Sequence, residues 1–122
     1  MPMITAEIFA PYDATLPATF AKILHINAVS HLHATADLLT IRVAFSPCQD
    51  EWYFNAARLN RATTPSFYVF APIGPGVATD IEVTRFTVET RDQLKAEMVA
   101  LYPSAQFPNL PDRTKVVVVA MV

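Results

Sequence analysis

The chain of 122 residues is 52% hydrophobic and only 16% charged, with a formal net charge of −2 at pH 7. This length predicts a single domain, residues 1–122, with one modest core. The weak negative charge, without a Lys/Arg cluster, argues against nucleic acid as a partner. The last apolar run, residues 116–122, is too short to span a membrane, and Cys48 is the single cysteine. We therefore expect a soluble cytoplasmic protein without disulfides, whose apolar surface is partly buried between copies of the chain.

The first half of the chain predicts a strand, a helix and a second strand. Residues 2–9 (PMITAEIF) predict a strand, which residues 10–13 (APYD) interrupt. Residues 16–33 are ambiguous, because alternate residues are apolar, but 18 residues without a turn are long for a strand. We predict a helix there, with apolar residues nearly all round its axis, so it should be buried on more than one side. Residues 38–45 then predict a clear strand, in which alternate residues are apolar.

The second half begins after the aromatic segment 51–54 (EWYF), and residues 66–71 predict its first strand. Residues 81–88 alternate again and suggest an additional strand. A helix that ends at Leu101 should follow, capped by Thr90 with Gln93 completing a capping box. Residues 115–122 predict the last strand. Because residues 116–119 are all valine, we expect this strand to be covered on both faces, as central parallel strands are.

This order of elements predicts an α+β fold built from two β-α-β units, a pseudo-repeat of residues 1–64 and 65–122. Side by side, the two units would form a four-stranded mixed sheet with both helices on one face. An antiparallel β-sandwich stays open as an alternative, with residues 20–45 forming a long hairpin.

Pro2 invites a chemical interpretation, because removal of Met1 would leave it as a free secondary amine. An α-amino group has a pKa of about 8 in water, and burial lowers this pKa because it disfavours the ammonium form. The amine would then be a general base near neutral pH. The alternative is that Pro2 is a common second residue without a chemical role.

Several segments of the chain also match a known pattern. The chain opens with Met-Pro and an apolar strand, residues 40–45 read TIRVAF, and residues 51–53 (EWY) follow about ten residues after the arginine. Residues 111–113 (PDR) precede the last apolar strand. In these segments the chain resembles the tautomerase superfamily, which includes 4-oxalocrotonate tautomerase, the cis-3-chloroacrylic acid dehalogenases and macrophage migration inhibitory factor. The resemblance implies this family's fold, with two β-α-β units per chain, and a homotrimer.

The resemblance also implies roles for individual residues. Pro2 matches the catalytic proline, and Arg42 matches an arginine that binds a substrate carboxylate, often across a subunit boundary. A guanidinium suits this role because its planar fork donates two parallel hydrogen bonds to a carboxylate. Trp52 or Tyr53 would form an aromatic wall near the proline, and His31 lies where dehalogenase-like members place a histidine. The plain alternatives are an arginine and a histidine at the surface, and aromatic residues in a core or interface.

The chain also departs from the family's pattern. Tyr12 stands where simpler members have a second arginine, and Asn55 and Ala56 replace a glycine pair that usually follows the aromatic segment. No arginine pair follows the strand at residues 66–71, unlike in dehalogenase-like members. These departures bear on which substrate the protein accepts.

Our first hypothesis is a tautomerase-like enzyme that acts on a keto–enol or unsaturated carboxylate substrate without a cofactor. A metal site is not expected, because His25, His31 and His33 are not accompanied by a cluster of cysteine or carboxylate residues. The alternative function is that of a non-catalytic homo-oligomeric assembly protein, with the same fold or with a β-sandwich fold.

Overall fold

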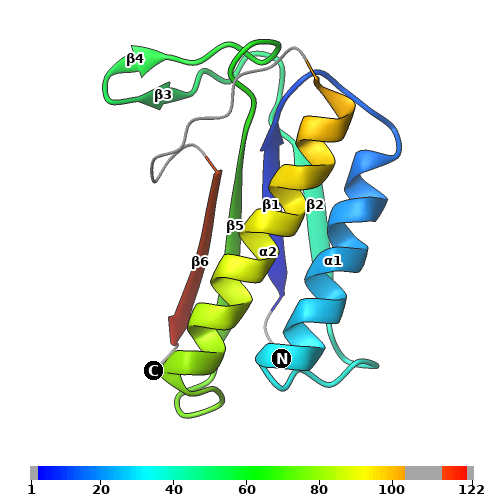
Figure 1. The fold of residues 1–122 in the computed structure, drawn as a ribbon, viewed down its shortest axis with the longest axis vertical. Helices are drawn as coiled ribbons and strands as arrows, with labels where there is room; N and C mark the ends of the chain where they lie inside the picture. The colour runs from blue at the N-terminus through cyan, green and yellow to red at the C-terminus, as the bar shows by residue number, and fades with distance from the viewer. Residues whose placement is uncertain (1–2, 104–113, 121–122) are drawn as a thin grey trace.

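The computed structural model of the protein describes residues 3–103 and 114–120. Within these residues a four-stranded sheet carries two helices on one face, and a short hairpin stands at one end of the sheet (Figure 1). The elements are β1 (Ile4–Phe9), α1 (Leu16–His31), β2 (Ile41–Phe45), β3 (Tyr53–Phe54), β4 (Ala57–Arg58), β5 (Ser66–Ile73), α2 (Asp80–Leu101) and β6 (Thr114–Ala120). The predicted α+β fold, with a four-stranded mixed sheet and both helices on one face, is confirmed.

The strand order in the sheet is β2-β1-β5-β6. Strand β1 pairs parallel with β2, β5 pairs parallel with β6, and the antiparallel pair β1–β5 joins the two β-α-β units. The last strand, β6, is an edge strand of the described sheet, and the helices cover only one of its faces, so the expected cover on both faces is wrong for the single chain. Its valines alternate in environment: Val116 is buried in the core under the helices, whereas Val117 and Val119 are half-buried on the open face.

The core lies between the sheet and the two helices. Alternate residues of β1 point into it, because side chains in a strand point to opposite faces in turn; Ile4, Ala6 and Ile8 are all buried. At the centre, the rings of Phe20 on α1 and Phe67 on β5 pack edge to face, with centroids 5.5 Å apart. Both phenylalanines are fully buried, so one core draws on both halves of the chain.

Helix α1 settles the ambiguity of residues 16–33 in favour of the helix, so the β-sandwich alternative is wrong. Its buried residues form one stripe at helical spacing: Leu16, Phe20, Leu24, Asn27 and Ala28. Other apolar side chains of this helix stay outside the stripe, with Ile26 52% and Val29 36% exposed. The expected burial of α1 on more than one side is therefore wrong within a single chain.

Helix α2 begins at Asp80, so the predicted strand at residues 81–88 is wrong. The reason is the residue before it: Thr79 Oγ1 accepts a hydrogen bond from the Glu82 N–H, and Glu82 Oε1 accepts one from the Thr79 N–H. This capping box begins the helix eleven residues before Thr90, the cap that was expected from the sequence. Thr90 itself lies in the middle of α2, and its side chain is fully buried. The hydrogen bond from the Thr79 N–H lowers the pKa of Glu82.

Polar side chains link the two helices. Asn27 Nδ2 donates hydrogen bonds of 3.0 Å to Thr90 Oγ1 and to Gln93 Oε1, which satisfies a buried amide at the helix interface. At the end of α1, His31 Nε2 lies 2.7 Å from Glu89 Oε2 on α2. Neither helix of the described residues combines the length and the apolar composition that crossing a membrane requires.

Candidate functional site

Arg42 lies on the face of the sheet that the helices leave open. Its neighbours in β2, Ile41 and Val43, pack against the core, so the alternation of the strand turns Arg42 to the other face. The guanidinium is exposed, and it makes no hydrogen bond or ion pair with the residues that the structure describes. An arginine without a partner is free to bind an anion from solution.

A small cleft of about 240 Å³ adjoins Arg42, lined by Thr5, Ala6, Glu7, Arg42, Ala44 and Tyr68. The register of the sheet explains this grouping. Thr5 of β1 is opposite Arg42 of β2, and Glu7, two residues on, is opposite Ala44 of β2 and Tyr68 of β5. Neither Glu7 nor Tyr68 was identified from the sequence, because a register between distant strands cannot be read from the spacing within one strand.

The predicted base Pro2 lies outside the described residues. Thr5, which is opposite Arg42, follows Pro2 by three positions in the chain. Arg42 is therefore next to the beginning of β1, and Figure 1 shows β1 running upward from this lower end of the sheet.

Trp52 lies at the other end of β1. Its ring stacks on Phe9 with centroids 5.1 Å apart and an interplanar angle of 16°, and its Nε1–H donates to Ser46 Oγ at 3.1 Å. Phe9 follows Thr5 by four residues, which corresponds to about 13 Å along a strand. The structure therefore does not bring Trp52 and Arg42 together within one chain.

Arg61 links several residues at this end of the sheet, although no motif in the sequence singles it out. Its guanidinium carbon lies 4.5 Å from the centroid of the Phe9 ring, as in a cation–π contact. Arg61 Nη1 donates to the Ser46 carbonyl at 3.0 Å, and Nη2 donates to the Pro47 carbonyl. We call Phe9, Ser46, Trp52 and Arg61 the Phe9 clasp.

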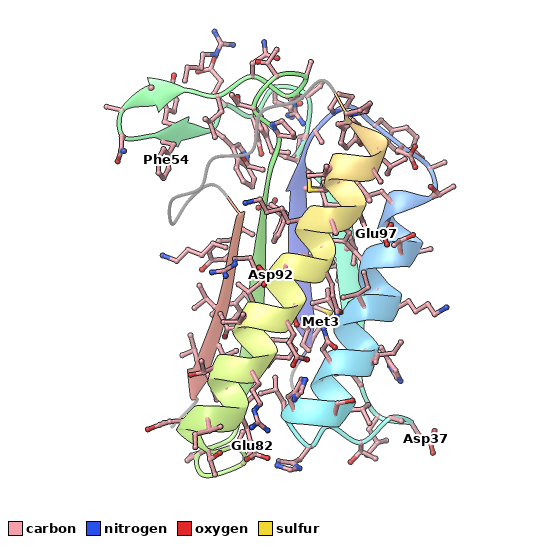
Figure 2. All side chains as sticks on the ribbon, in the orientation of Figure 1. Met3, Asp37, Phe54, Glu82, Asp92 and Glu97 are labelled. Atoms are coloured by element: carbon pink, nitrogen blue, oxygen red, sulfur yellow. The ribbon has the colours of Figure 1, made fainter. Side chains whose placement is uncertain are left out.

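Tyr53 belongs to β3 of the short hairpin, as does Phe54, which is labelled at the upper left of Figure 2. It is exposed, and its hydroxyl donates to Glu51 Oε2 at 2.9 Å, which raises the pKa of Tyr53. Asn55 and Ala56 form the turn with φ of 50° and 63°, the left-handed values that a tight hairpin turn requires. The missing glycine pair has therefore not removed the hairpin.

A larger cavity of about 660 Å³ lies beside the Phe9 clasp, and both acidic and basic residues line it. Its two arginines already have partners: Arg58 Nη2 lies 3.1 Å from Glu51 Oε1, and Arg61 donates to backbone carbonyls. This cavity therefore offers a carboxylate no unpaired cation among the described residues, in contrast to the cleft at Arg42.

His31 lies in the helix layer, on the other side of the sheet from Arg42. Its Nε2 is already hydrogen-bonded to Glu89, so the structure does not bring it to the cleft in a single chain. No group of three or more histidine, cysteine, aspartate or glutamate side chains in the described part of the chain is arranged to hold a metal ion.

Neither family models nor curated protein sequences match this chain, but solved structures do. One is F6 fused 4-OT, described as a wild-type asymmetric trimer, with a TM-score of 0.71 and 16% identity over 98% of this chain and 86% of its own. N1, a member of the cis-3-chloroacrylic acid dehalogenase family, has a TM-score of 0.68 and 14% identity over 98% of this chain and 75% of its own. A macrophage migration inhibitory factor from Toxoplasma gondii has a TM-score of 0.64 and 8% identity over 98% and 90%. The chain therefore has the fold of the tautomerase superfamily, as the sequence resemblance predicted.

Proposed function

We propose that the protein is a tautomerase-like enzyme that acts on a keto–enol or unsaturated carboxylate substrate. The observation that carries this proposal is the Arg42 guanidinium, which has no partner among the described residues and lies in a cleft next to the beginning of β1. The fold, which is that of a superfamily of tautomerases and dehalogenases, supports the same conclusion.

In the proposed reaction the Pro2 amine is the base and Arg42 binds the substrate carboxylate. The amine accepts the proton of the enol hydroxyl, the electron pair moves through the carbon–carbon double bond, and the prolinium returns a proton to carbon. The keto product thus has the same atoms and charge as the enol. Arg42 draws the developing negative charge toward the carboxylate. Chain connectivity suits this pairing, because three residues span at most about 11 Å between Pro2 and Thr5.

Replacing Arg42 tests the carboxylate-binding role. We expect Arg42→Ala to raise KM for phenylpyruvate about tenfold or more, because charge-assisted hydrogen bonds contribute about 1.5–3 kcal/mol. The free energy of unfolding should change little, since Arg42 is exposed and has no partner among the described residues. Steady-state kinetics and urea denaturation measure the two effects.

Arg85→Ala is the matched control, because Arg85 is an exposed arginine in the helix layer. This variant should keep the native KM. An Arg42→Ala enzyme whose KM equals that of the native enzyme would return Arg42 to the role of an ordinary surface residue.

We further propose that the active form is a homotrimer, in which Trp52 and Tyr53 serve the site of a neighbouring copy. The wide separation of Trp52 from Arg42 in one chain supports this arrangement. His31 stays a predicted substrate-binding residue, and that role would require it to leave Glu89.

The surface of the sheet is consistent with such an assembly. In the described part of the chain, β2 and β6 are edge strands, and edges of this kind favour pairing with another chain. The open face is largely apolar: Tyr68 is 40% exposed, and Phe70, Val117 and Val119 are half-buried. We expect sedimentation velocity at micromolar concentration to show three times the mass of the chain. A monomer under these conditions would contradict the proposal that Trp52 and Tyr53 serve the site of a neighbouring copy.

A further inference from the structure

The open face of the sheet carries few charged residues, and two of them share the cleft. Glu7 and Arg42 both line it, on adjacent strands. Glu7 makes no ion pair or hydrogen bond with the described residues, as is also true of Arg42. Lys115, opposite Tyr68 on β6, lies outside the lining of the cleft. A bound anion would therefore meet one cation and one carboxylate.

Glu7 and Arg42 are diagonal neighbours rather than a direct pair. Thr5 is opposite Arg42, and Glu7 is two residues further along β1 on the same face. Side chains at such diagonal positions are separated by about 7 Å at their base. A small ligand held by Arg42 would therefore extend toward the Glu7 carboxylate.

We propose that this cleft accepts a small, singly charged carboxylate, and that Glu7 is the specificity-determining residue that disfavours a second anionic group. The proposal rests on the carboxylate-binding role of Arg42 proposed above. A volume of about 240 Å³ corresponds to about eight water molecules at about 30 Å³ each, so the cleft takes a small ligand. A second carboxylate on so short a ligand would lie close to Glu7. Repulsion between unit charges about 6 Å apart, partly screened by water, weakens affinity about tenfold.

Tyr68 defines what can occupy the far end of the cleft instead. It is opposite Glu7 on β5 and lines the cleft. Its hydroxyl is neutral and can both donate and accept a hydrogen bond. The substrate class is thus a monocarboxylate whose other polar group is a neutral carbonyl or hydroxyl.

The test compares two acids that differ at one end, where one has a methyl group and the other has a second carboxylate. trans-But-2-enoate and fumarate share a four-carbon unsaturated skeleton, and only fumarate has a carboxylate at each end. We expect NMR titration of the full chain to give a Kd about tenfold lower for but-2-enoate than for fumarate. In Glu7→Gln the ratio of the fumarate Kd to the but-2-enoate Kd should fall to about one or two, because fumarate binds more tightly. The Kd of but-2-enoate should change less than about twofold.

Glu97→Gln is the matched control, because it removes the same charge from an exposed residue of α2, in the helix layer (Figure 2). It should leave the Kd ratio of the two acids unchanged. A tenfold ratio that also disappears in Glu97→Gln would show an effect of net charge and overturn the role of Glu7.

Two further outcomes would overturn the proposal. Equal affinity of the native protein for both acids would show that Glu7 does not select. An equal decrease in the Kd of both acids in Glu7→Gln would show that Glu7 only competes for the Arg42 guanidinium.

A third variant separates this proposal from the proposed function. Arg42→Gln should raise the Kd of both acids. Unchanged Kd values in that variant would show that the acids bind elsewhere and would overturn both proposals. Because these measurements need no turnover, a protein that shows the predicted Kd ratio but no tautomerase activity would contradict only the chemistry.

Discussion

Protein with an N-terminal tag is expected to lose at least about a hundredfold of its tautomerase activity, because general acid–base catalysis contributes about 10²–10⁴-fold. With any residue attached to it, Pro2 is an amide and its nitrogen no longer accepts a proton. The native enzyme needs Met1 to be removed, which an intact mass measurement shows directly. Ketonisation of the enol form of phenylpyruvate is the assay for both proteins.

The pH dependence follows from the same amine. In the proposed site, burial of the amine and the like charge of Arg42 would both disfavour the ammonium form, so the pKa of Pro2 should lie below that of an ordinary prolyl amine. Since the base acts unprotonated, activity should be lost below this pKa and reach a plateau above it. In Arg42→Ala the pH midpoint of activity should rise, because the like charge that lowers the pKa of Pro2 is gone.

Pro2→Ala is the informative companion to the tagged protein, because it keeps an amine at the same position. We expect a partial loss of activity and an unchanged free energy of unfolding. Equal activity of tagged and untagged protein would show that Pro2 is not the base. An untagged protein that has lost Met1, forms trimers and is still inactive would favour the non-catalytic assembly protein.

The second large effect concerns stability. Phe20→Ala should lower the free energy of unfolding by about 3–5 kcal/mol, the cost typical of removing a buried phenylalanine ring. Phe20 is fully buried and packs against Phe67, so the truncation leaves a cavity where α1 meets the sheet. Because domains of this size are stable by only about 5–15 kcal/mol, urea denaturation should show a much lower midpoint.

Ile26→Ala, on the same helix, is the control. Ile26 is 52% exposed, so its truncation should change the free energy of unfolding by less than about 0.5 kcal/mol. Phe20 and Phe67 belong to different halves of the pseudo-repeat, so Phe20→Ala should shift a single transition. Two separate transitions would show that the halves 1–64 and 65–122 are independent domains.

The sequence predicted the main strands and the first helix, but it misplaced the start of the second helix. Ile81 and Val88 alternate with polar residues as in a strand, yet both are exposed residues of α2. The residues that bury its inner face recur every four positions: Phe86, Thr90, Leu94 and Met98. The alternation of exposed β-branched residues thus predicted a strand at residues 81–88, and the helical stripe was overlooked because one of its four residues is a threonine. Thr79 and Glu82 held the decisive signal, a capping box eleven residues earlier than expected.

The candidate site could be predicted only in part, and for a physical reason. Arg42 was selected by the motif around it, and the structure gives it an open cleft. Glu7 and Tyr68 join that cleft through pairing with strands that are distant in the sequence. A glutamate in the middle of an apolar strand was a usable signal, since it must face away from the core. Trp52 was selected by its position, but no pattern within the segment shows that Phe9 and Arg61 hold it.

The Phe9 clasp also contains an intrinsic fluorescent probe, Trp52. Trp52 is the single tryptophan of the chain, half-buried on Phe9 with its N–H bonded to Ser46. Its fluorescence therefore reports the solvation of this end of the sheet, whereas far-ultraviolet circular dichroism is dominated by the two helices. Recording both signals in one titration separates opening of the clasp from loss of the core. Thr5, opposite Arg42, lies about 13 Å from Phe9 along β1, so quenching of the emission by a carboxylate bound at that cleft would favour the proposed trimer, in which the tryptophan of another copy serves the site.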